Sequence, residues 1–226
     1  MKALIFDLDD TLWPIAPVIM AAEAKLHEWM AQETPAVVER YSIEDLRLRR
    51  QALVATDARF SYDLWALRHT LLAQVFGELG VDVNKVDHAM HVFACERSRV
   101  TMFSDVLPAL NQLRERFVLA SISNGFADLQ AIGLDQHFSV SLAAHQFGCA
   151  KPDSRIFLAM LTHLKLEPEE CMYVGDDLRN DVQGAQQVGM RAAWVNRQGI
   201  VLENTPHVGI KPDLEVRDLR ELIDAL

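Results

Sequence analysis

The sequence predicts an α/β protein in which helices cover both faces of a doubly wound parallel sheet. Five short apolar runs alternate with segments that carry apolar residues at helical spacing. Nearly continuous apolar runs are typical of parallel strands, because both faces of such a sheet are covered. Residues 14–100 interrupt this alternation with a long stretch of helical character that contains no convincing strand. A helical domain is therefore expected to be inserted after the first strand.

The regular elements of the core follow from these apolar patterns. The expected strands are Ala3–Phe6, Phe117–Ile122, Val140–Ala144, Cys171–Val174 and Ala192–Val195. The expected helices are Val106–Arg116, Ala127–Ile132, Asp153–Leu164 and Asp181–Val188. Pro108, Pro152 and Pro168 lie near expected helix starts, where the fixed φ angle and missing amide of proline are tolerated. A chain that alternates strand and helix in this way is predicted to form a Rossmann-like, doubly wound sheet.

The inserted stretch is rich in Ala, Leu, Glu, Arg and Gln. We expect its helices at Ala16–Gln32, Ile43–Val54, Tyr62–Leu79 and Val86–Arg97. The chain is thus predicted to consist of an α/β core, residues 1–13 and 101–226, and a helical domain, residues 14–100. Because the insertion follows the first strand, we expect it over the carboxyl edge of the sheet, where open α/β sheets bind their ligands.

Composition and charge restrict the class of protein and its partners. The hydrophobic fraction of 50% is ordinary for a globular domain, and no apolar run approaches the length of a membrane span or a secretory segment. A formal net charge of -10 opposes binding to nucleic acid. The three cysteines are odd in number and widely spaced, which favours buried thiols in a reducing compartment. We therefore expect a cytoplasmic monomer or homodimer with no nucleic-acid or membrane partner.

Polar side chains that can carry chemistry follow four of the five expected strands. They are Asp7 and Asp9 after the first strand, Ser123 and Asn124 after the second, Lys151 after the third, and Asp176, Asp177 and Asp181 after the fourth. Parallel strands end at a common edge, so these groups should gather there. Several carboxylates, a lysine and a hydroxyl suit a hard cation and a phosphate group.

Each residue type has a chemical role at such an edge. Clustered carboxylates repel one another, and a divalent cation such as Mg²⁺ keeps them ionised while accepting phosphate oxygens as ligands. A deprotonated aspartate, Asp7, can attack phosphorus to form an acyl phosphate. The second aspartate, Asp9, can protonate the leaving alkoxide and later deprotonate water. Lys151 and Ser123 can stabilise the phosphoryl oxygens.

Four segments resemble the ordered motifs of the haloacid dehalogenase superfamily. They are Asp7-Leu8-Asp9-Asp10-Thr11-Leu12, Ser121-Ile122-Ser123-Asn124-Gly125, Lys151-Pro152-Asp153 and Gly175-Asp176-Asp177-Leu178-Arg179-Asn180-Asp181. One such motif alone would be weak evidence. Four in the correct order, each after an expected strand, make coincidence very improbable.

The resemblance implies a role for each matching position. It makes Asp7 the nucleophile and a metal ligand, and Asp9 the general acid and base that lends its backbone carbonyl to magnesium. Ser123, Asn124 and Lys151 match the phosphate-binding segments. Asp176 matches a metal ligand, and Asp181 would support the metal through water or through its ligands. The helical insertion matches a type-one mobile cap.

Simpler interpretations remain for several residues. Aspartates after strands often serve only as turn or N-cap residues, and this is the favoured interpretation for Asp10 and Asp177. Trp65 and Arg68 in the insertion could contact a substrate, yet packing or surface exposure explains them equally well. Trp13 stands where the chain enters the insertion and is a candidate pocket wall.

The expected function is magnesium-dependent hydrolysis of a small phosphorylated metabolite through an aspartyl-phosphate intermediate. Within the superfamily the sequence looks like the bacterial group that contains FMN and phosphoribitylaminouracil phosphatases, so flavin-pathway and nucleotide phosphates are candidate substrates. One alternative is a 2-haloacid dehalogenase, which has no acid at the position of Asp9 and needs no metal. Another is a non-catalytic binding protein on the same fold.

Overall fold

The computed structural model describes residues 1–226, which form two compact units. The α/β unit comprises Met1–Pro14, Thr101–Gly125 and Gly133–Leu226. The helical unit comprises Ile15–Val100 together with Phe126–Ile132. Residues 126–132 fall within the core expected from the sequence, residues 1–13 and 101–226. They group with the helical unit because the ring of Phe126 packs against Trp65 and Phe93, with ring centroids 5.5 Å and 6.1 Å apart.

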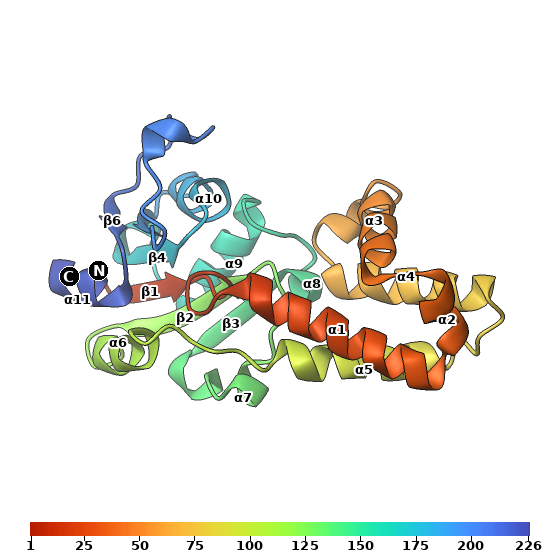
Figure 1. Ribbon diagram of the computed structural model, residues 1–226. Helices are drawn as coiled ribbons and strands as arrows, with labels where there is room; N and C mark the ends of the chain where they lie inside the picture. The colour runs from red at the N-terminus through yellow and green to blue at the C-terminus, as the bar shows by residue number, and fades with distance from the viewer. The chain divides into compact units, whose positions relative to one another are not determined.

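The α/β unit contains a six-stranded, all-parallel sheet, which confirms the predicted fold class (Figure 1). The strands are β1 (Ala3–Phe6), β2 (Val118–Ser123), β3 (Val140–Ala143), β4 (Cys171–Gly175), β5 (Arg191–Val195) and β6 (Leu214–Val216). Their order is β3-β2-β1-β4-β5-β6. Strand order therefore reverses at β1, and the crevice at such a reversal is where doubly wound sheets bind ligands.

Five strands were expected, and β6 was missed. It has three residues, and Glu215 at its centre is exposed, so it carries no apolar run. Its backbone pairs with β5 in register from Ala193 and Leu214 onward. A short edge strand held by one neighbour leaves little periodic signal in a sequence.

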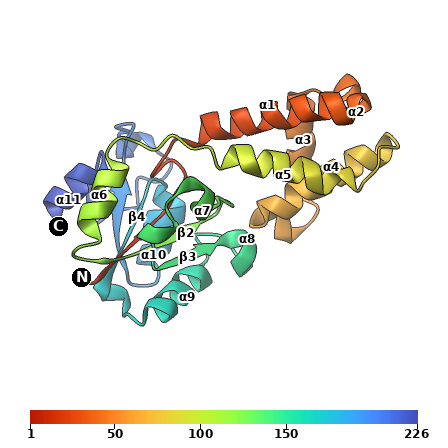
Figure 2. The ribbon, with the colours of Figure 1, turned by 90° about the horizontal axis from the view of Figure 1, so that it is seen from below.

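Both faces of the sheet are covered. The helices of this unit are α6 (Val106–Leu113), α8 (Ala144–Phe147), α9 (Ser154–Leu164), α10 (Gly184–Gln186) and α11 (Leu219–Ala225). Side chains of α9 and α10 join Ala3 and Ile5 of β1 in one apolar cluster. The alternate β1 residues Leu4 and Phe6 are also fully buried. Helices α6 and α11 lie against each other (Figure 2).

The helix expected at 181–188 begins earlier and has an unusual first part. Residues Leu178–Gln183 form a π-helical segment, in which the amide of Val182 donates to the carbonyl of Asp177 at 3.2 Å, and α10 follows directly. Wide helical turns of this kind are frequent at functional sites. This one carries Asp181.

The helical unit is built from five longer helices and has its own core. They are α1 (Ile15–Glu33), α2 (Pro35–Arg40), α3 (Ile43–Val54), α4 (Leu64–Glu78) and α5 (Lys85–Arg97), and the short α7 (Leu129–Ile132) joins them. Helices α1 and α5 run side by side (Figure 1). Helix α3 begins with a capping box between Ser42 and Asp45. Pro35 opens helix α2, which is not among the helices expected from the sequence.

No helix has the combination of length and apolar character that a membrane crossing requires. Cys149 and Cys171 are buried thiols, as expected. Cys95 is exposed instead, because it lies on the outer face of α5 beside His91.

Candidate active site

The residues expected to carry chemistry line one open pocket at the carboxyl edge of the sheet. Its volume is about 170 Å³. The lining residues are Asp7, Asp9, Asp10, Ser123, Asn124, Gly125, Lys151, Asp176, Asp177, Asn180 and Asp181. Six aspartates and one lysine therefore face the same small volume. An anionic substrate could enter such a pocket only if a cation offset much of this charge.

In the loop after β1 the apolar residues are buried, and the acidic side chains therefore face the pocket. Leu8, Leu12 and Trp13 are at most 3% exposed. The amide of Leu12 donates to the carbonyl of Leu8 at 2.8 Å, which closes the turn. Asp10 has a φ angle of 60°, a left-handed conformation that aspartate tolerates better than most residues.

Trp13 holds the side chain of Asp9. The fully buried indole donates from Nε1 to Oδ1 of Asp9 at 2.9 Å, and the two backbones form an isolated bridge. Trp13 was expected as a candidate pocket wall. The structure instead places it behind Asp9, where it orients the carboxylate.

Lys151 is the buried cation of the site. Its Nζ donates to Oδ1 of Asp7 at 2.6 Å, to Oδ1 of Asp181 at 2.6 Å and to the hydroxyl of Tyr173 at 2.7 Å. The Tyr173 hydroxyl in turn donates to the carbonyl of Ile122 at 2.9 Å. Burial disfavours the ammonium, but the Asp181 and Asp7 carboxylates outweigh it and raise the pKa of Lys151. The lysine is therefore fixed in its charged form beside Asp7.

The second motif supplies the Ser123 hydroxyl and the Asn124 side chain, which hydrogen-bonds to the backbone of Lys151. The Ser123 hydroxyl accepts from the amide of Gly125 at 2.9 Å and still has its own proton to donate. The Asn124 side chain donates to the carbonyl of Lys151 at 3.0 Å and accepts from its amide at 2.8 Å. Asn124 was expected to bind phosphate, and the structure shows its amide group engaged in holding the Lys151 backbone.

The fourth motif brings two further carboxylates to Asp7. One carboxylate oxygen from each of Asp7, Asp176 and Asp181 lies within 4.8 Å of the others. Thr11 donates to Oδ1 of Asp176 at 2.8 Å. The carboxylate of Asp181 approaches Gly175 so closely that a Cβ there would overlap it. Glycine at 175 is thus a requirement of the packing at this site.

Burial and mutual repulsion raise the pKa values of these carboxyl groups. Burial, together with the charges of Asp7 and Asp181, raises the pKa of Asp176 to about 8. Burial also raises the pKa of Asp181 to about 7, although Lys151 opposes the shift. The pKa of Asp7 is raised by burial as well, against the effect of Lys151. Such shifts are typical of functional sites, where a bound cation would reverse them.

The donor set fits a hard divalent cation. Three carboxylates converge, no sulfur or imidazole is among them, and their raised pKa values show that their negative charge is only partly compensated. Mg²⁺ prefers oxygen ligands and is commonly held by a few carboxylates while keeping positions for water or phosphate. Asp181 is expected to support the metal through water or through its ligands, and one of its carboxylate oxygens lies within 4.8 Å of one from each of Asp7 and Asp176.

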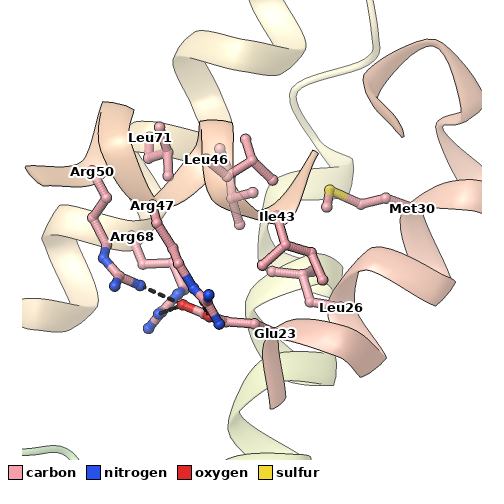
Figure 3. Close-up of a pocket in the computed structure, with 10 residues that line it drawn as sticks. Glu23, Leu26, Met30, Ile43, Leu46, Arg47, Arg50, Arg68 and Leu71 are labelled. Atoms are coloured by element: carbon pink, nitrogen blue, oxygen red, sulfur yellow. Dashed lines mark hydrogen bonds and ion pairs between the residues drawn. The ribbon is translucent and has the colours of Figure 1, made fainter. Parts of the chain in front are cut away.

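Two candidate residues of the sequence analysis, Trp65 and Arg68, lie in the helical unit. Trp65 is half-buried, with its ring edge-on to Phe126. Arg68 is buried and pairs with Glu23 at 3.4 Å (Figure 3).

Sequence reasoning missed three residues that organise the site. Tyr173 anchors Lys151, Thr11 holds Asp176, and the indole of Trp194 donates to the carbonyl of Asp176 at 2.8 Å. Thr11 belongs to the first motif, and Tyr173 is the only hydroxyl-bearing residue of its strand. Those two features could have drawn attention to them. Trp194 offers no such signal, because an aromatic residue in a buried strand is ordinary core.

Comparison with known proteins places the chain in a family. A family model described as haloacid dehalogenase-like hydrolase matches residues 1–189. The chain belongs to the haloacid dehalogenase-like hydrolases. The four motifs noted in the sequence lie within the matched region, and the predicted resemblance is confirmed.

Relatives of this hydrolase include two named phosphatases. It is 31% identical to the 5-amino-6-(5-phospho-D-ribitylamino)uracil phosphatase YigB of Escherichia coli, over 98% of this chain and 94% of that protein. It is 32% identical to a phosphoserine phosphatase of Thermus thermophilus, over 98% of both chains. A solved structure described as a 2-haloacid dehalogenase from Pseudomonas syringae is 36% identical, with a TM-score of 0.91, over 99% of this chain and 97% of that one. Both chemistries considered from the sequence thus occur among its relatives.

Proposed function

We propose that this hydrolase cleaves a small phosphate monoester with the help of Mg²⁺, using Asp7 as nucleophile. It is a phosphatase of the haloacid dehalogenase type. The proposal is carried by the position of Asp9. This residue lines the pocket beside Asp7, and the indole of Trp13 holds it in place. An acid in this position has a task only when the leaving group needs a proton, and an alkoxide leaving phosphorus does.

The reaction begins with Asp7 and its neighbours. The charged Lys151 lies 2.6 Å from Oδ1 of Asp7 and offsets the charge of the carboxylate and of an incoming phosphate. The second carboxylate oxygen of Asp7 attacks phosphorus, the bond to the ester oxygen breaks, and Asp9 gives its proton to the departing alkoxide. The product is an alcohol and an acyl phosphate on Asp7.

The second half regenerates the enzyme. Asp9, now ionised, takes a proton from a water molecule, which attacks phosphorus and releases inorganic phosphate from Asp7. In both steps the Ser123 hydroxyl, which lines the pocket, is proposed to donate to a phosphoryl oxygen. Each proton lost by Asp9 in the first step is recovered in the second.

Asp7, Asp176 and Asp181 would hold the metal. Mg²⁺ bound there supplies positive charge that keeps the three carboxylates ionised and polarises the phosphoryl group. The close approach of their oxygens within 4.8 Å supports this assignment. Asp9 would add its backbone carbonyl, as the family resemblance implies, while its carboxyl group serves as the acid and base.

The named relatives support a small phosphorylated metabolite as substrate. One of them acts on 5-amino-6-(5-phospho-D-ribitylamino)uracil and the other on phosphoserine, so the proposed substrate class is a low-molecular-weight phosphate monoester. The helical unit is proposed to act as the cap that selects among such esters, as the family resemblance implies.

Dehalogenation is the second candidate, because the solved structure at 36% identity is described as a 2-haloacid dehalogenase. That chemistry also uses an aspartate nucleophile, but halide is a stable anion that leaves without a proton. It would give Asp9 no task, and it would leave the three converging carboxylates without a purpose. Loss of Asp7, Asp9 or Lys151 would have favoured a non-catalytic protein, and all three are present.

A parallel product assay separates the candidates. The enzyme is incubated with a panel of phosphate monoesters and with 2-chloropropionate, each with Mg²⁺ and with EDTA, and phosphate and chloride are measured. We expect phosphate release that needs Mg²⁺ and no chloride above background. The Asp9→Asn variant should lose about 10²–10⁴-fold of its activity on alkyl phosphates. Metal-independent chloride release with an unaffected Asp9→Asn variant would replace the phosphatase with a dehalogenase.

A further inference from the structure

Arg197 follows β5 and binds two groups of the α/β unit that lie far from it in the sequence. Its Nε and Nη2 donate to the main-chain carbonyl of Thr11 at 3.0 Å and 2.8 Å. Its Nη1 and Nη2 donate to the two carboxylate oxygens of Asp105 at 3.1 Å and 3.0 Å. Because the N–H donors of a guanidinium form a rigid fork, these hydrogen bonds hold both partners in a fixed relation to each other.

The charge of Arg197 is compensated by Asp105. The side chains of the two residues are 13% and 5% exposed. Asp105 also accepts from the amide of Leu219 at 2.9 Å, at the start of α11. Burial alone would raise the pKa of the Asp105 carboxyl group, but Arg197 and this amide lower it. Arg197 therefore belongs to a complete ion pair, and its free side of interest is the one that faces Thr11.

Thr11 connects Arg197 to the acidic pocket. The residue is fully buried, and it lies in the loop after β1 rather than in a helix or strand. A buried carbonyl in a loop needs a hydrogen-bond partner from elsewhere in the chain, and Arg197 supplies it. The Thr11 hydroxyl donates to Oδ1 of Asp176 at 2.8 Å. One residue thus accepts from the guanidinium and donates to a carboxylate of the pocket.

The end of β5 holds Asp176 in two ways. Trp194, the fourth residue of β5, donates from its indole to the main-chain carbonyl of Asp176 at 2.8 Å. Arg197 follows three residues later and reaches the carboxylate of Asp176 through Thr11. The main chain and the carboxylate of Asp176 are therefore both fixed from the strand next to β4.

We propose that Arg197 is a positioning residue of the metal site and acts on Asp176 through Thr11. This inference rests on the proposed binding of Mg²⁺ by Asp7, Asp176 and Asp181. Mg²⁺ demands near-ideal octahedral geometry, so a ligand whose support is loosened binds it less well. Loss of a partner that supports a metal ligand typically weakens metal binding by about 10–100-fold. The charge of Arg197 has the opposite effect, because a cation near the site repels Mg²⁺.

The test measures the affinity of the full-length protein for Mg²⁺ alone, by isothermal titration calorimetry at constant ionic strength and without substrate. Arg197→Lys keeps the charge beside Asp105 but lacks the fork that also reaches Thr11. We expect this change to weaken Mg²⁺ binding by about 10–100-fold. At saturating Mg²⁺, kcat on a phosphate ester should return close to that of the parent. Arg191→Lys is the matched control and should leave the affinity unchanged, because Arg191 is exposed at the opposite end of β5.

Thr11→Val tests the path from Arg197 to Asp176. Valine has nearly the shape of threonine but no hydroxyl, so this variant should itself bind Mg²⁺ less tightly. Adding Arg197→Lys to it should cause little further loss, because the path is already broken, whereas independent effects would add.

Circular dichroism and urea melts check that each variant is folded. Arg197 lines a cavity of about 280 Å³, so a shorter side chain there borders existing space. If Arg197→Lys does not fold, the double variant Asp105→Asn, Arg197→Gln takes its place, because it removes both charges together and leaves no buried charge unpaired. It should weaken Mg²⁺ binding as well, since it also lacks the guanidinium fork on Thr11.

The possible failures are distinguishable. If a folded variant that lacks the Arg197 fork binds Mg²⁺ as tightly as the parent, the role of Arg197 is overturned and the proposed function stands. Losses from Arg197→Lys and Thr11→Val that simply add would likewise overturn the path through Thr11. A parent protein that binds no Mg²⁺ would overturn the proposed metal site and this inference with it.

Discussion

Replacing Trp13 with phenylalanine should damage proton transfer more than phosphate binding. The change removes the indole N–H that donates to Asp9 at 2.9 Å and leaves an aromatic ring in the same buried place. A hydrogen bond to a charged group contributes about 1.5–3 kcal/mol. If the bond serves to hold Asp9 for catalysis, its loss slows the reaction by about 10- to 100-fold.

The effect should depend on the leaving group. An alkyl phosphate needs a proton from Asp9, whereas p-nitrophenyl phosphate releases a stable phenolate and needs it far less. We therefore expect kcat on an alkyl phosphate to fall by the full factor, with a clearly smaller loss on p-nitrophenyl phosphate. Trp29→Phe is the control, because Trp29 lies in the helical unit, where its ring packs against His88 and the apolar core of that unit. Equal losses on both esters, or none, would refute the assigned role of Trp13, provided thermal melting shows the variant folded.

Two more perturbations follow from the carboxylate group. Gly175→Ala should destabilise the protein by about 1–3 kcal/mol and remove most of the activity, because the new methyl group overlaps Asp181. Urea melts and activity assays measure both effects. Gly77→Ala is the control and should change neither, because the space around Gly77 is open. The pKa values of about 8 for Asp176 and about 7 for Asp181 lie above the ordinary 3.8, so the folded, metal-free protein keeps protons that the unfolded chain has lost. The stability that these groups contribute is therefore fully present below pH 3.8 and is lost progressively as the pH rises from there through about 7 to 8. Because Mg²⁺ displaces those protons, the rise in Tm on adding Mg²⁺ should be larger at pH 8 than at pH 6; a rise that is equal at both would contradict the assignment.

The sequence was sufficient to predict five of the six strands and the edge at which the acids gather. Parallel strands such as β1 and β4 are buried on both faces, so their apolar runs are continuous and easy to recognise. Aspartates directly after such runs must lie at the carboxyl edge, which is why Asp7 and Asp176 could be placed together. The family motifs then linked these positions to a known chemistry.

Interactions across long sequence separations could not be predicted in this way. The indole of Trp194 holds the Asp176 backbone, and the Asn124 amide holds Lys151, yet neither residue differs in pattern from core or turn residues. The grouping of residues 126–132 with the helical unit depends on ring contacts of Phe126, which have no local signature. Periodicity reports which face of an element is buried, but not the partner that buries it.

The most direct test of Asp7 as the phosphoryl acceptor is to trap the intermediate. Asp9→Asn should slow hydrolysis of the acyl phosphate, because Asp9 activates the water that attacks it. Mixing this variant with Mg²⁺ and a phosphate ester such as p-nitrophenyl phosphate, followed by rapid quench and mass spectrometry, should show one phosphoryl group on the peptide that contains Asp7. The doubly substituted Asp7→Asn, Asp9→Asn protein should show none. Two results together would contradict the assignment of Asp7 as the phosphoryl acceptor. One is a folded Asp7→Asn variant that retains more than a few per cent of turnover, and the other is an Asp9→Asn protein without an adduct.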